Sequence, residues 1–536
     1  MNIAYDGLWL GALFISLVTA DVFALLHYLH MFQLNGYKPE VQLRWLAGNK
    51  RDWLKRNGAA FAGFAAALLV SLTSAPKGLI LLLALLYVNA VSVGYCRRPR
   101  PKKPLVCTYR VKRLLAACAV LFFLGLVPLL SFARFRAEIA AAYAAAAHVL
   151  APWFVLLANW VNSPLEKRIN RWYVEDAKRL LAERPGLTTV GVTGSWGKTS
   201  TKFFLHKLLS LKYNVLMTPE NFNTTLGVVR ALREELRPFH EVFVCEMGAR
   251  NPGDVAEICE LVRPKFGVIT SIGPQHLESF KTLENVVKTK FELADAVSGQ
   301  PGGTVFLNLS SEPIRDEYAR RRDSGPAAVS FGFAEDCGYR ATGIRVSEEG
   351  SSFTLRFPDG TETPFKTRLI GEHNVANILG AVAAADCLGV ARSALAAAVQ
   401  RLESVPHRLQ LIRGGGYLVI DDAYNSNAAG AKAALDALAL FDGCKILVTP
   451  GMVELGERQD ELNRILGVQA AAVCDFAALV GSQQTISVRR GLIDAGFPQE
   501  KIFAAERLNQ ALAWVADLNP EKRKVILLEN DLPDNY

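Results

Sequence analysis

The chain has 536 residues and a net charge of +9, and its length allows two or three domains, each with its own core. The positive excess lies before Glu166, where 17 Lys and Arg residues stand against 5 Asp and Glu residues, so the slightly acidic remainder offers no basic face for a nucleic acid. Nine scattered cysteines contain no CxxC pair, which argues against a zinc site or a disulfide framework.

The first 165 residues are predicted to form a membrane domain. Five apolar runs there each approach the ~20 residues that a helix needs to cross a bilayer. The absence of a basic segment before the first run, and the runs that follow it, argue against a cleaved signal peptide. The predicted spans are Leu8–Leu26, Ala59–Ser74, Leu79–Tyr95, Leu114–Phe132 and Ile139–Val161.

Two basic loops predict the orientation of these spans. Most of the Lys and Arg residues of the first 165 residues, called the leader below, lie in the two loops Lys38–Arg56 and Arg97–Arg113. Loops rich in Lys and Arg stay in the cytoplasm. Everything after the fifth span is therefore expected to be cytoplasmic. Asp21, within the first run, is interpreted as an interfacial or helix-packing residue.

Beyond Pro185 short β-branched runs alternate with helical stretches, which predicts βαβ units on a parallel sheet. The first strand leads into "TGSWGKTS", where Gly194, Gly197, Lys198, Thr199 and Ser200 are spaced as in a phosphate-binding loop. Backbone amides would face the phosphates, the lysine would add a positive charge and the Thr199 hydroxyl would ligate magnesium. Val192 stands where the general pattern has its first glycine, so the loop alone is a weak signal.

Three further residues follow later strands. Glu246 ends the apolar run "VFVCE", where a carboxylate at the tip of a buried strand can hold the metal that neutralises a triphosphate. The alternative is an ordinary surface glutamate. His276 follows a third strand, and Lys290 lies on the helix after it.

The order and wording of these segments resemble the Mur ligases, the ATP-dependent amino-acid and peptide ligases of peptidoglycan synthesis. The resemblance begins near Thr188 and reaches almost to the C-terminus. Within the family it is greatest to the MurF type, which adds D-alanyl-D-alanine to UDP-N-acetylmuramoyl-tripeptide. The segments that carry it are "TGSWGKTST", "TPENFNTTLGV", "CEMGARNPGDV", "ITSIGPQHLESF", "KTKFEL", "GEHNVANILGAVAAA", "PHRLQ", "VIDDAYNSNAAGAKAAL" and "PGMVELGE".

The resemblance implies the cofactors: ATP, two magnesium ions and carbon dioxide. Thr199 and Glu246 would hold one magnesium between the ATP phosphates, and Lys198 would be catalytic. His276 would ligate a second magnesium, and Lys290 matches the lysine that becomes a carbamate. A free ammonium would repel two divalent cations, whereas a carbamate presents an anionic oxygen pair to them.

The remaining implied roles concern the nucleotide. Asn377, in the HNxxN motif, would lie by the adenine. Arg408 would approach the γ-phosphate and Asp422 the ribose, with Asp421 as a rival for the second role.

The expected architecture is therefore α/β: a helical transmembrane domain over residues 1–165, a central P-loop ATPase domain over 186–403 and a C-terminal Rossmann-like domain over 404–536. The reaction would join a cell-wall peptide precursor to an amino acid or dipeptide through an acyl phosphate. The expected location is the bacterial cytoplasmic membrane, with several spans and with the catalytic domains in the cytoplasm.

The sequence also departs from the family. Only about 28 residues separate the last predicted span from the phosphate loop, too few for the domain that grips the uridine nucleotide. The leader is therefore expected to give location or access to a lipid-linked substrate, or its basic loops merely fix topology. Thr224 stands where the family has the second of two paired asparagines. Pro450-Gly451 and the ending "LLENDLPDNY" also differ from the MurF pattern, and these two changes leave the identity of the amine open. Alternatives are a ligase for another envelope substrate and a nucleotide-driven transporter or regulator. The oligomeric state is not predicted.

Overall fold

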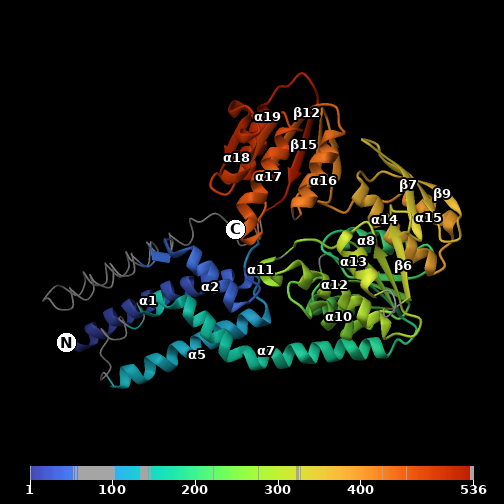
Figure 1. Ribbon diagram of the computed structural model, residues 1–536. Coiled ribbons are helices and arrows are strands. Elements are labelled where there is room, and N and C mark those ends of the chain that lie inside the picture. The colour runs from blue at the N-terminus through green and yellow to red at the C-terminus, as the bar shows by residue number, and fades with distance from the viewer. Residues whose placement is uncertain are drawn as a thin grey trace. The chain divides into compact units, whose positions relative to one another are not determined.

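The computed structural model describes residues 2–531 except 52, 55–56, 58–102, 133–142, 144–145, 221, 276, 322–324, 326, 425–426 and 454 (Figure 1). The chain divides into two compact units. One comprises Met1–Arg171 with Pro533–Tyr536, and the other comprises Trp172–Leu532.

The first unit is helical in its described residues. Apolar side chains of three helices, among them Phe32, Leu114 and Val155, form its core. Asp21 is buried and its Oδ1 lies 3.4 Å from Nδ1 of His148, so this carboxyl is a helix-packing group. The helices are α1 (Asn2–Leu34), α2 (Pro39–Gly48), α5 (Tyr109–Phe132) and the first part of α7 (Ala151–Ala182).

The predicted multi-pass membrane localisation is wrong. Among the described residues one helix, Tyr109–Pro128, is long and apolar enough to cross a membrane, with a mean hydropathy of 1.9, and core helices of soluble proteins pass the same test. Hydropathy over a window records composition alone, and a helix that buries apolar residues against its neighbours gives the same signal. The runs Ala59–Ser74 and Leu79–Tyr95, and part of Ile139–Val161, lie outside the described residues.

The second unit begins with a nine-stranded sheet in the order β2-β3-β1-β4-β5-β6-β7-β8-β9. Pairs from β2 through β7 are parallel, and β8 and β9 add antiparallel pairs at one edge. The strands are β1 (Thr188–Thr193), β2 (Val215–Met217), β3 (Val242–Glu246), β4 (Phe266–Ile269), β5 (Thr304–Asn308), β6 (Ala327–Gly332), β7 (Tyr339–Ser347), β8 (Gly350–Arg356) and β9 (Glu362–Thr367).

Helices cover both faces of this sheet because its central strands are apolar on both sides. In β3, Val242 and Val244 face one core, and Phe243 and Cys245 face the other. The first core lies under α8 (Lys198–Leu209), α14 (Glu372–Cys387) and α15 (Arg392–Val399). The second lies under α9 (Thr225–Glu235), α10 (Asp254–Val262), α12 (Leu283–Ser298) and α13 (Glu312–Arg321), with the short α11 (Leu277–Phe280) contributing Phe280.

A second sheet follows, with six strands in the order β10-β11-β15-β12-β13-β14 (orange to red in Figure 1). Its β10–β11 pair is antiparallel and the other pairs are parallel. The predicted α/β class is thus confirmed for this part of the chain. The elements are β10 (Gln410–Gly414), β11 (Tyr417–Asp422), α16 (Ala428–Ala439), β12 (Cys444–Thr449), α17 (Gln459–Ala471), β13 (Phe476–Val480), α18 (Ile486–Asp494), β14 (Ile502–Ala505), α19 (Leu508–Asp517) and β15 (Lys524–Glu529).

Candidate active site

The predicted phosphate loop connects β1 to α8 at the carboxyl end of the parallel strands. Gly194 and Gly197 adopt φ angles of 151° and 78°, a region that favours glycine. A Cβ on Gly197 would lie 2.2 Å from Oδ1 of Asn377, and one on Gly194 would lie 2.1 Å from Oγ1 of Thr270. The loop therefore needs both glycines for its conformation and for its close packing.

Lys198 begins α8 and turns back over the loop. Its Nζ donates to the carbonyl oxygens of Gly194 at 2.7 Å and Ser195 at 2.9 Å. Burial lowers the pKa of Lys198 to about 8; the charge of Arg408 acts in the same direction, and Glu246 opposes it. The loop thus holds a cation that phosphate oxygens could attract from the two carbonyl groups.

Glu246 lies at the end of β3 with 1% of its surface exposed. Its Oε1 accepts from Thr199 Oγ1 at 3.2 Å and from Asn223 Nδ2 at 3.1 Å, and its Oε2 lies 3.1 Å from Lys202 Nζ. Burial acts to raise the pKa of Glu246, but the positive charges of Lys202 and Lys198 outweigh it and hold that pKa below its usual value. An ionised carboxylate beside a threonine hydroxyl is a donor set that suits magnesium.

Lys290 lies on α12 with 2% of its surface exposed. Its Nζ is 5.9 Å from the centroid of the Phe280 ring, and no hydrogen bond or ion pair to it is found among the described residues. Burial lowers the pKa of Lys290 to about 7; Lys198 acts in the same direction, while Asp254 and Glu292 oppose it. His276, its predicted partner at a second metal, lies outside the described residues.

Asn377 of α14 contacts the phosphate loop itself. Its Oδ1 accepts from Thr201 Oγ1 at 3.3 Å and adjoins Gly197. The structure therefore connects α14 to the start of α8 through this amide. Its predicted place beside the adenine stays a prediction.

Two adjacent carboxylates end β11 and have different partners. Asp421 Oδ2 lies 2.8 Å from His407 Nδ1, and its Oδ1 accepts from the Ala423 amide at 3.1 Å. Asp422 Oδ1 accepts from the Leu409 amide at 3.1 Å, and burial raises the pKa of Asp422 to about 6.

Arg408 stands between two left-handed residues of the connecting segment. His407 and Leu409 have φ angles of 59° and 46°. The Arg408 guanidinium lies 4.2 Å from the centroid of the Tyr424 ring. The γ-phosphate role of Arg408, and the choice between Asp421 and Asp422 for the ribose, stay predictions.

Sequence reasoning missed two contacts around the loop. Lys202 was not singled out, although it follows Lys198 by one helical turn and so shares its face of α8. Asn223, the second asparagine of "TPENFNTTLGV", was not assigned a role, yet its side chain donates to Glu246.

Trp196, a residue of the phosphate loop, packs against Gly273, where a Cβ would lie 2.0 Å from the indole ring. Gly273→Ala is therefore expected to displace Trp196 and to cost about 1–3 kcal/mol of stability, as overpacking does in other cores. Nucleotide affinity should fall with it, which thermal unfolding and ADP titration would measure. Gly186→Ala is the control, because nothing lies within 4 Å of the added atom. Unchanged nucleotide affinity in Gly273→Ala would show that the Trp196 contact does not shape the loop.

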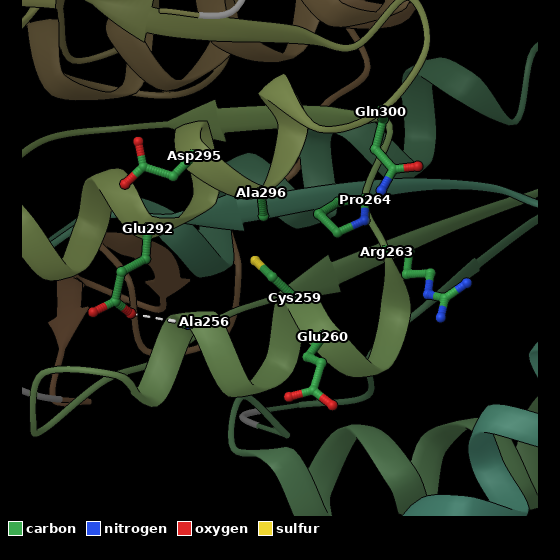
Figure 2. A pocket seen from close by; sticks show the side chains of 9 residues that line it. All are labelled: Ala256, Cys259, Glu260, Arg263, Pro264, Glu292, Asp295, Ala296 and Gln300. Atoms are coloured by element: carbon green, nitrogen blue, oxygen red, sulfur yellow. Dashed lines mark hydrogen bonds between the residues drawn. The ribbon is translucent and has the colours of Figure 1, made fainter.

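A hollow of about 550 Å³ lies between α10 and α12 and contains none of the predicted site residues (Figure 2). In it, Glu292 accepts from the backbone amides of Gly253 at 2.7 Å and Ala256 at 2.8 Å, which caps the start of α10. Burial raises the pKa of the Cys259 thiol to about 12, so this sulfur is a poor nucleophile. We assign no catalytic role to this hollow.

Comparison with known proteins places the same segments in one family. The Mur ligase middle domain matches residues 192–385, and the "Mur ligase, glutamate ligase domain" matches residues 407–529. The UDP-N-acetylmuramoyl-tripeptide--D-alanyl-D-alanine ligase of Escherichia coli (strain K12) is 32% identical over 62% of this chain and 75% of that protein. The Bacillus subtilis (strain 168) protein of the same name is 32% identical over 54% of this chain and 62% of its own length.

Solved structures agree with this likeness. MurF from Acinetobacter baumannii superposes with a TM-score of 0.61 at 27% identity, over 67% of this chain and 77% of the other. MurF ligase from Thermotoga maritima, in complex with ADP, gives a TM-score of 0.58 at 26% identity, over 67% and 80% of the two chains.

Proposed function

The chain belongs to the Mur ligase family, and from that premise we propose that it is an ATP-dependent amide ligase that extends a peptidoglycan peptide precursor. The observation that carries this proposal is the hydrogen bond between Thr199 and the buried carboxylate of Glu246 at a phosphate loop, in a domain that also buries a second lysine, Lys290. A nucleotide-driven transporter has no use for that second lysine.

The first half-reaction would form an acyl phosphate. A carboxylate oxygen of the acyl substrate attacks the γ-phosphorus of ATP, and ADP leaves with the electrons of the broken P–O bond. Lys198 would offset the charge on the transferring group, and the loop amides would hold the remaining phosphate oxygens. Glu246 and Thr199 would hold magnesium, which when bound neutralises phosphate charge.

The second half-reaction would form the amide. The amine nitrogen attacks the acyl carbon, the C–O bond to phosphate breaks, and inorganic phosphate leaves as the nitrogen loses a proton. The chain contributes by holding the two reactants together, which converts a bimolecular step into an effectively unimolecular one. Arg408 and Asp422 of the C-terminal part would approach the γ-phosphate and the ribose.

Lys290 is proposed to act as a carbamate. The ammonium first loses one proton to give the neutral amine. The amine nitrogen then attacks carbon dioxide, an N–C bond forms as one C=O π bond gives its electrons to oxygen, and a second proton is released, so that a cation becomes an anion. The burial of Lys290, the absence of a described ion-pair partner and a pKa of about 7 all favour the neutral amine that this addition needs. With His276, the carbamate would hold a second magnesium.

We propose UDP-N-acetylmuramoyl-tripeptide as the acyl substrate and D-alanyl-D-alanine as the amine. The names of the relatives from E. coli and B. subtilis support this choice. The matched domains begin at residue 192, and the B. subtilis match spans 62% of that relative, so the choice rests on the catalytic domains.

Phosphate release by the full chain tests the proposal. With ATP and magnesium, phosphate and a tripeptide product extended by two alanines are expected only when both substrates are present, as mass spectrometry would show. Omission of either substrate should reduce phosphate release at least tenfold. Phosphate release that depends on neither substrate would contradict a ligase and favour a nucleotide-driven transporter or regulator.

A further inference from the structure

Lys202 is a fully buried lysine one turn into α8, with 0% of its surface exposed. Its Nζ lies 3.1 Å from Glu246 Oε2 and donates to the Glu220 carbonyl oxygen at 2.6 Å. A buried ammonium is tolerated only when it is paired and hydrogen-bonded. Both partners of Lys202 belong to segments next to the phosphate loop, and none of the roles assigned above uses this lysine.

The ion pair with Lys202 restricts the orientation of the Glu246 carboxylate. Lys202 holds Oε2, and Thr199 and Asn223 donate to Oε1. The two oxygens therefore have different environments: one faces a fixed cation and the other faces the hydroxyl that begins α8. With Oε2 held, the carboxylate cannot rotate freely, so Oε1 is presented in a fixed direction to a metal beside Thr199.

Lys202 also holds the segment Pro219–Thr224 through its hydrogen bond to the Glu220 carbonyl oxygen. Glu220 has a φ angle of 37°, a left-handed conformation that is uncommon for a residue with a side chain. Such a conformation persists when surrounding contacts hold it, and the bond from Lys202 to the Glu220 carbonyl is one such contact. Three residues on, Asn223 returns to Glu246 through its side chain. The segment is thus linked to Glu246 in two ways, directly through the Asn223 side chain and indirectly through Lys202 at the Glu220 carbonyl.

We propose that Lys202 is a positioning residue that orients Glu246 for magnesium and couples that carboxylate to the segment Pro219–Thr224. This inference rests on the proposed function, because it takes Glu246 as the magnesium ligand. This segment is the first part of the stretch "PENFNTT" next to the phosphate loop. A change in the position of the Glu246 carboxylate would therefore be transmitted to the segment through Lys202.

Magnesium-dependent nucleotide binding tests the proposal without the acyl substrate. ADP would be titrated into the full chain by calorimetry, over a range of magnesium concentrations and again in excess chelator. Lys202→Met should raise the magnesium concentration needed for half-maximal enhancement of ADP binding about tenfold or more, with ADP affinity in chelator unchanged within twofold. Lys207→Met is the matched control, since Lys207 is an exposed lysine on the same helix, and it should behave as the wild type.

Lys202→Arg guards against a failure to fold. It keeps the positive charge, but its planar guanidinium differs in shape from an ammonium, so the magnesium requirement should lie between those of the wild type and Lys202→Met. Backbone hydrogen exchange of residues 220 and 222–224 should be faster in both variants than in the wild type.

The outcomes separate the two hypotheses. If Lys202→Met folds and its ADP binding depends on magnesium as in the wild type, the inference is overturned and the proposed function is unaffected. If Lys202→Met does not fold, the same result with Lys202→Arg has the same meaning. An equal loss of ADP affinity with and without magnesium also overturns the inference, because that pattern indicates a structural role only. A wild-type chain whose ADP binding ignores magnesium overturns the proposed function and this inference with it.

Discussion

Lys198→Ala is expected to lower the rate of ATP-dependent ligation by about a hundredfold to a thousandfold, the cost of removing one preorganised group from a charge-stabilising site in other enzymes. Lys198 is the lysine of the phosphate loop, and its Nζ already lies at the loop carbonyls of Gly194 and Ser195. Alanine leaves the transferring phosphoryl group without that charge. Phosphate release with both substrates present, at saturating ATP, would measure the loss.

The control for this variant is Lys207→Ala, which removes an exposed lysine from the same helix. Both proteins should unfold at similar temperatures, since Lys198 is only partly buried and its hydrogen bonds are to loop carbonyls. A Lys198→Ala enzyme that ligates within threefold of the wild-type rate would show that this loop does not carry the transferred phosphate.

Lys290→Ala is expected to be nearly inactive and to regain part of its activity with acetate or another short carboxylate. In the proposed mechanism Lys290 supplies an anionic oxygen pair, and its removal leaves a small buried space on α12 for a free carboxylate to occupy. The loss should be about a hundredfold or more. Ligation rates measured against acetate concentration, at constant ionic strength, would show the rescue.

The exposed Lys288 on the same helix gives the control, Lys288→Ala, which should retain full activity and show no response to acetate. Mass spectrometry of wild-type enzyme kept under carbon dioxide should show one added carbamate, absent from the alanine variant. Full activity of Lys290→Ala, or an unmodified amine in active wild-type enzyme, would remove the second metal site from the mechanism.

Local pattern was sufficient to predict the strand, turn and helix start that form the phosphate loop. A β-branched run followed by two glycines, a lysine and a threonine specifies a strand, a left-handed turn and a helix start within a dozen residues. Each of these features depends on residues close together in the chain. The position of Glu246 depends on strand order as well, since neighbouring parallel strands end at one edge of the sheet and bring its carboxylate to Thr199.

For the leader, residues 1–165, local pattern was not sufficient. Its apolar runs indicated spans because a hydropathy window sums composition over one segment. Whether those side chains face lipid or other helices depends on residues far apart in the sequence, as with Phe32, Leu114 and Val155 in one core. The membrane prediction failed because composition does not say whether an apolar helix face contacts lipid or another helix.

The sequence by itself determined the alternation of strands and helices and the backbone pattern of the phosphate loop, because each is encoded by neighbours in the chain. The roles of Lys198, Glu246 and Lys290 stay predictions. Only the tertiary structure decided which polar groups meet. Lys202 pairs with Glu246 across 44 residues, and Asn377 reaches Thr201 across 176. Such contacts depend on strand order and helix packing, and a buried charge reveals its role only when the fold places the opposite charge beside it.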